Sequence, residues 1–265
     1  MSSWSLFPPR TQELQLDEKW AFVYRKQRDC DLENSEDHHQ GDCWDHVAFD
    51  PEHRLVLGVI CGKRSSTRIS QLMGNVKRQL QDRLPRLITS DEFGPYRHVV
   101  DQLWNSPPRP APCGQGRRRR SQRKTKSKLN YATVCKHREG GRVVEVKTQI
   151  VFGSKRSIAR ALKQSSVSSA INTSFLERHN GTDRHRNARK VRRTYRFSKD
   201  WNIHEAVTFF SYYTYNFCWC VRTLRKRMGR KHRYQPRTPA MSAGLTDHVW
   251  NLKEWLTRPV TALTC

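Results

Sequence analysis

The chain has 265 residues, and its 50 lysines and arginines against 24 acidic residues give a net charge of +26. Such a charge opposes compact folding unless a polyanion binds, and nucleic acid is the commonest such partner because released counterions drive the association. The sequence has no apolar run of transmembrane length, no signal peptide and no basic amphipathic helix, which excludes a membrane partner.

Apolar patterning predicts an α/β arrangement for the first part of the chain. Residues 14–24 and 44–49 alternate like strands, and residues 55–61 form the continuous apolar run of a strand covered on both faces. Three such strands in succession predict an antiparallel meander. A capped amphipathic helix follows and runs to Pro85, and then come a strand at 86–90 and a helix at 92–104. This order implies one crossover connection.

The second part of the chain is more basic. Residues 105–128 combine prolines with a run of arginines and lysines, and this composition predicts a disordered insertion. The expected elements after it are a strand at 142–152, a short helix at 155–164, a basic helix or helix pair at 172–193 and an aromatic helix at 201–221. The aromatic helix is predicted to be buried on most sides, with one stripe made of Ile203, Ala206, Val207, Phe210, Tyr213 and Phe217.

The predicted organisation is an N-terminal tail over 1–13, one α/β domain over 14–228 and a C-terminal tail with a short helix over 229–265. Within the domain, Asp17 lies inside the first strand, where aspartate is uncommon, and Asp91 ends the short strand at 86–90. Neighbouring carboxylates repel by about 4 kcal/mol per pair, so proteins gather them where a hard cation neutralises them. The alternatives are a solvated charge for Asp17 and a helix cap for Asp91.

A third acid is harder to choose from spacing, which leaves Glu139, Glu145 and Glu177 as candidates. Glu139 lies beside a predicted glycine turn, Glu145 lies in an alternating strand, and Glu177 lies on a predicted helix. If that helix is continuous, Asn180 and Arg184 share the face of Glu177 at offsets of three and seven residues. The alternative is a solvated basic helix.

Several segments resemble one family. They are LDEKWAFV around Asp17, ITSDEFGPYRHVV around Asp91 and NTSFLERHNGTDRHRNARKVRRTYRFSKD around Glu177, followed by YNFCW and RTPAMSAGLTDHVW. The chain resembles, over most of residues 14–250, insertion-sequence transposases of the IS-one-like family in the DDE superfamily. The resemblance implies an RNase H-like fold, in which helices flank a mixed five-stranded sheet and a helical C-terminal extension follows.

The resemblance also implies a function. Asp17, Asp91 and Glu177 become the catalytic, metal-binding triad for two Mg²⁺ ions, for which Mn²⁺ can substitute. The expected reaction is hydrolysis of a strand at the element end, followed by attack of the freed 3′-OH on target DNA. Residues expected to contact DNA are Arg178, Asn180, Arg184, Arg186, Arg189 and Lys190, with Arg117, Arg118, Arg119 and Arg120 as a flexible phosphate-binding arm.

The expected partners are element ends and target DNA, with the chain forming a homo-oligomer on DNA. A separate DNA-end-recognition domain or the product of an upstream frame would complete the system. The eight cysteines form no CxxC pair, so a zinc ribbon is not indicated. Without an export signal, they are expected to be reduced thiols in an intracellular protein, and the expected location is the cytoplasm, in association with the nucleoid. The alternative functions are a non-catalytic or truncated DNA-binding derivative of a transposase and a structure-selective RNase H-like nuclease.

Overall fold

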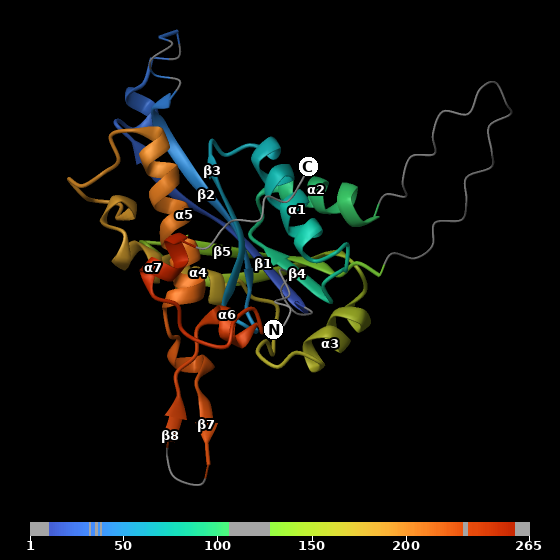
Figure 1. The fold of residues 1–265 in the computed structure, drawn as a ribbon. Coiled ribbons are helices and arrows are strands. Elements are labelled where there is room, and N and C mark those ends of the chain that lie inside the picture. Colours follow the sequence, from blue (N-terminus) through green and yellow to red (C-terminus); the bar gives the residue numbers. More distant parts are fainter. Residues whose placement is uncertain are drawn as a thin grey trace, which may run out of the picture.

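A mixed sheet with helices on both faces forms the centre of the molecule (Figure 1). The computed structural model describes residues 11–105 except 32, 35, 36 and 38, residues 128–229 and residues 233–257. The strands of the sheet follow the order β3-β2-β1-β4-β5-β6. Their bounds are β1 Glu13–Val23, β2 Gly41–Asp50, β3 Leu55–Gly62, β4 Leu87–Ser90, β5 Tyr131–Glu139 and β6 Arg142–Phe152.

The expected antiparallel meander of β1, β2 and β3 is confirmed, and β4 pairs with β1 in parallel. The sheet has six strands where five were predicted, because β5 was missed. Its residues 131–134 are buried in succession and include the small residues Ala132 and Thr133, so the segment shows no alternation. The strand order is compatible with the RNase H-like fold that the resemblance implies.

Among the helices that the structure describes, α1 and α2 cover one face of the sheet, whereas α3, α4 and α5 cover the other. Side chains of α1 and α2 pack with Leu14 and Leu16 in the main core, whereas α4 and α5 pack over β2 and β3, and α3 packs over Leu87. The bounds of the helices are α1 Ser66–Gln79, α2 Gly94–Val100, α3 Lys155–Lys163, α4 Ser174–Arg186, α5 Trp201–Cys218, α6 Pro239–Ser242 and α7 Leu252–Thr257. None of the helices that the structure describes is both long and apolar enough to span a bilayer.

The first helix is shorter than predicted. It ends at Gln79, and Gln81 and Asp82 adopt left-handed φ angles of 52° and 58°, which turn the chain before Pro85 is reached. The expected helix at 92–104 is α2 followed by a π-helical turn over Asp101–Asn105.

The aromatic helix α5 is less buried along its predicted stripe than expected. Ile203 is 53% exposed and Phe210 is 40% exposed, whereas polar residues such as Asn216 are buried. Asn216 donates to the carbonyl of Val56 at 2.8 Å and accepts from its amide at 3.0 Å. A pattern based on hydrophobicity misses the buried position of Asn216, because its polar side chain is paired with the backbone of the edge strand β3.

Residues near both ends of the described chain contact other parts of the molecule. The Thr11 hydroxyl donates to Asp50, so packed structure begins before residue 14. Ala243 lies in the main core, and the ring of Trp250 lies 4.5 Å from that of Phe217. A small hairpin, β7 Lys226–Met228 with β8 Arg233–Gln235, precedes Ala243 in the chain. The predicted basic insertion, apart from its end residues 105 and 128, lies outside the described residues.

His179 anchors α4 between the sheet and α5. Its imidazole is 5% exposed and lies 5.2 Å from the ring of Phe49 and 4.4 Å from that of Tyr215. Burial, aided by the positive charges of Lys19 and Arg186, lowers the pKa of His179 to about 3. The ring therefore stays neutral in the folded protein at a pH where it would be protonated in the unfolded chain.

We expect His179→Gln to weaken the pH dependence of folding stability. Below pH 6.5 the unfolded chain takes up a proton that the folded chain does not, so stability is lost as the pH falls. Between pH 7 and pH 5 this loss is about 2 kcal/mol. Urea unfolding at both pH values measures it, with His185→Gln on the exposed side of α4 as the control. An equal pH dependence in parent and His179→Gln would contradict the assignment.

Candidate metal centre

Alternate side chains of β1 fix the position of α4. Gln15 donates to the carbonyl of Asn172 at 3.0 Å and accepts from the Leu176 amide at 3.0 Å. Two residues further along the strand, Asp17 accepts a hydrogen bond from the side-chain amide of Asn180 at 2.8 Å. Because residues i and i+2 of a strand share a face, these bonds align the helix along β1. The face of β1 that carries Asp17 is therefore covered by α4, the helix that carries Glu177.

Asp91 lies beside Asp17 and comes from the neighbouring strand β4. In the parallel pairing of β1 with β4, Leu16 lies opposite Ser90, so Asp17 and Asp91 follow side by side. Asp91 also accepts from the Phe93 amide at 3.1 Å, so the capping role considered for it is partly correct. The register thus brings two acids 74 positions apart in sequence to one point of the sheet.

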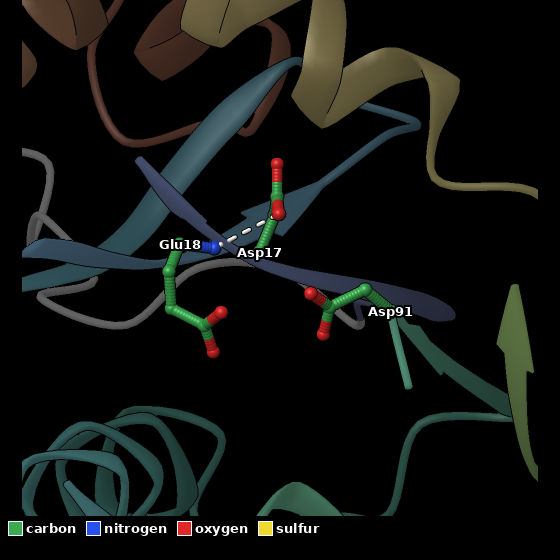
Figure 2. Close-up of side chains that lie close together, drawn as sticks. All are labelled: Asp17, Glu18 and Asp91. Atoms are coloured by element: carbon green, nitrogen blue, oxygen red, sulfur yellow. Dashed lines mark hydrogen bonds between the residues drawn. The ribbon is translucent and has the colours of Figure 1, made fainter. Parts of the chain in front are cut away.

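A third carboxylate in this group is Glu18, which the sequence did not single out. Carboxylate oxygens of Asp17, Glu18 and Asp91 all lie within 4.8 Å of one another. Figure 2 shows Asp17 and Glu18 leaving β1 in opposite directions, with Asp91 across from both. Alternation assigns Glu18 to the face opposite Asp17, which is why the strand pattern gave no reason to choose it. The adjacent acidic pair Asp17-Glu18 was the available signal.

Glu177 lines the same cavity, which has a volume of about 470 Å³. The other two candidates for the third acid, Glu139 and Glu145, lie on β5 and β6 outside it. The helix is continuous, and Glu177, Asn180 and Arg184 all face the cavity, as their spacing predicted. Glu177 lies apart from the tight group of three carboxylates, since it forms an ion pair with Lys136 and accepts from the Thr173 hydroxyl at 2.5 Å.

The acids in this cavity strongly affect one another. Burial, together with the charges of Asp91 and Glu177, raises the pKa of Asp17 to about 7. Burial and the charge of Asp91 likewise raise the pKa of Glu18 to about 7, and burial raises that of Asp91. For Glu177, hydrogen bonds from Lys136 and Thr173 outweigh burial and lower the pKa. Additional positive charge would therefore favour the ionised forms of the acids on β1 and β4.

The donor set fits a hard divalent cation. All of the gathered ligand atoms are carboxylate oxygens, which Mg²⁺ and Mn²⁺ prefer. The Oε1 atom of Glu18 is buried without a hydrogen bond of full geometry, although the Tyr96 hydroxyl interacts with this carboxylate. The three gathered carboxylates thus fit one such cation, and Glu177 lines the same cavity.

Basic residues surround the acids. Arg184 lines the cavity together with Lys136, Arg138 and Arg192. Arg178, Arg186 and Arg189 are exposed, and the guanidinium of Arg186 stacks 3.7 Å from the Trp219 ring. The segment with Arg117 to Arg120 lies outside the described residues.

Lys190 corrects an expectation, because it was expected to hold a DNA phosphate. Its side chain is only 1% exposed, and its ammonium lies 2.7 Å from Asp45 and 2.8 Å from His204. A charge paired inside the core cannot reach a phosphate on the surface. Lys190 is therefore removed from the proposed DNA-binding residues.

Comparison with known proteins assigns no chemistry to this chain. No family model matches the chain, and no curated protein matches it. One solved structure, "Crystal structure of the Mos1 Strand Transfer Complex", is similar over 36% of the chain at 20% identity, with a TM-score of 0.24. The chain covers 32% of that protein, about a third of its length. At this TM-score the likeness carries no argument about fold or function.

Proposed function

We propose that this protein is a DDE-type DNA transposase that cleaves and joins DNA strands at insertion-sequence ends. The observation that carries the proposal is the meeting of Asp17, Asp91 and Glu177 around one cavity, from β1, β4 and α4. The family resemblance supports the same three residues. Arginines at the cavity and a net charge of +26 support DNA as the partner.

The three acids would hold two Mg²⁺ ions, with Mn²⁺ as a substitute. When bound, these ions activate the attacking oxygen and steady the leaving oxygen of the phosphodiester. Asn180 restrains the rotamer of Asp17 through its hydrogen bond, so this carboxylate is held at the cavity. Such preorganisation lowers the cost of assembling the site when substrate arrives.

Basic side chains would hold and orient the DNA. Arg184 lies two turns after Glu177 on the same face of α4 and reaches the cavity. Lys136 of β5 pairs with Glu177, and if Glu177 held a cation, the Lys136 ammonium could contact a phosphate instead. The exposed arginines Arg178, Arg186 and Arg189 would extend the phosphate contacts beyond the cavity. Assembly of a homo-oligomer on DNA, and a separate component that recognises element ends, stay predictions.

The test is Mg²⁺- or Mn²⁺-dependent nicking and strand joining on element ends. Asp91→Ala and Glu177→Ala are expected to reduce both activities about 10³-fold or more, since cations contribute several kcal/mol to such reactions. Glu139→Ala, an exposed acid outside the cavity, serves as the matched control and should retain activity.

The outcomes separate the proposal from its alternatives. If the parent and Asp91→Ala show the same activity, including none, the catalytic assignment loses its support. DNA binding without metal-dependent cleavage would then favour a non-catalytic derivative. Cleavage without joining would favour a structure-selective nuclease.

A further inference from the structure

We infer that Glu18 is a fourth carboxylate ligand of the metal centre, and that Arg64 takes the place of the cation when none is bound. The inference rests on the proposed function for the presence of a metal, and it adds two residues that the triad does not include. It is carried by the contacts of Glu18 and by the position of Arg64.

Glu18 is held at the site without being fully paired. Its side chain is 1% exposed and lines the cavity, with a carboxylate oxygen within 4.8 Å of those of Asp17 and Asp91. Its Oε2 accepts from Arg64, and the Tyr96 hydroxyl interacts with the same carboxylate, while its buried Oε1 has no hydrogen bond of full geometry. A buried carboxylate oxygen that is paired this weakly is costly in free energy, so such an atom calls for a further ligand. A cation shared with Asp17 and Asp91 supplies one.

Arg64 contacts two of the three acids. Its guanidinium lies 3.0 Å from Glu18 and 3.6 Å from Asp91. The same group stacks 3.8 Å from the Phe93 ring, so its position is fixed on one side by an aromatic face. Three carboxylates against one guanidinium leave two negative charges when all are ionised. That deficit matches one divalent cation, and its binding would release Arg64 from the acids.

The roles of Glu18 and Arg64 are tested by measuring Mn²⁺ binding to the whole chain, without DNA, by isothermal titration calorimetry. We expect Glu18→Gln to weaken Mn²⁺ binding at least tenfold. Glu13→Gln, another buried glutamate of β1 that does not line the cavity, should bind Mn²⁺ like the parent. Arg64→Met should bind Mn²⁺ more tightly than the parent, because a competing positive charge is gone. Unchanged affinity in both Glu18→Gln and Arg64→Met would overturn the inference.

A folding check and a second variant separate loss of a metal ligand from loss of structure. Circular dichroism checks that each variant is folded, and if Glu18→Gln is not, Glu18→Asp replaces it. Glu18→Asp retains the charge but draws it back by one methylene, so weaker binding there supports direct ligation, and parent-like binding contradicts it. If Mn²⁺ affinity depends on Glu18 but strand joining is absent, only the proposed function fails. If the parent binds no Mn²⁺, both fail.

Discussion

Replacing Asp17 by asparagine is expected to stabilise the metal-free protein while abolishing metal-dependent strand cleavage. The substitution removes a charge from a site where burial and the charges of Asp91 and Glu177 raise the pKa to about 7. An acid with a raised folded-state pKa destabilises the fold as the pH rises from 3.8 to about 7. At pH 8 the asparagine variant avoids this cost, and the gain is on the order of 2–4 kcal/mol.

The local hydrogen bonds allow the change. The Oδ1 atom of Asp17 accepts from the Glu18 amide at 2.9 Å, and asparagine keeps an oxygen for that bond. The Oδ2 atom accepts from Asn180, whose own Oδ1 is buried without a partner. Rotation of the Asn180 amide group would let that oxygen accept from the new side chain. The variant should therefore fold with α4 in place.

The loss of activity has a separate cause, since asparagine cannot supply the charge that a divalent cation requires from this position. A cation contributes several kcal/mol to phosphoryl transfer, so cleavage should fall by about 10³-fold or more. Urea unfolding in the presence of a chelator measures stability. In the same titration, added Mn²⁺ should stabilise the parent but not Asp17→Asn. Asp29→Asn at the exposed surface is the control. A less stable Asp17→Asn variant, or one that still cleaves, would contradict the proposed site.

The sequence predicted the elements whose apolar pattern matches their burial. The meander and α1 are of this kind, because Leu14, Leu16 and Leu72 carry the hydrophobic face that each element buries. The same reasoning missed β5, whose buried residues include alanine and threonine. It also misplaced the buried side of α5, where Asn216 and His204 are buried through hydrogen bonds.

The residues of the candidate site also divide into those that the sequence predicted and those that it missed. Asp17 and Asp91 follow from their positions on predicted strands, and the spacing of Glu177, Asn180 and Arg184 predicted a shared face. Choosing Glu177 over Glu139 and Glu145 required the family resemblance. Glu18 and Lys136 were missed because their roles depend on the register between strands and on a helix far away in sequence. Lys190 was misassigned because a lysine paired in the core has the same sequence signature as one on the surface.

That buried lysine belongs to a charge network whose disruption is expected to destabilise the protein by about 3–5 kcal/mol. Lys19 and Asp45 are both 0% exposed and lie 3.3 Å apart. Lys19 also pairs with Asp183 of α4, while Lys190 pairs with Asp45 at 2.7 Å. Two lysines and two aspartates thus balance each other between the sheet and α4. The positive charges of the lysines outweigh burial and hold the pKa of Asp45 well below its usual range.

Asp45→Asn should produce that loss, because it leaves Lys190 buried without a carboxylate. The free energy of unfolding measured in urea at pH 7 is the readout. The matched control is Asp29→Asn, where the ion pair with Arg28 is exposed and should contribute less than about 1 kcal/mol. Asp45→Leu combined with Lys190→Met should recover part of the loss, since an apolar pair removes both charges together. Equal stability of Asp45→Asn and Asp29→Asn would show that the network does not hold α4 on the sheet, and the alignment of Glu177 with Asp17 would need another explanation.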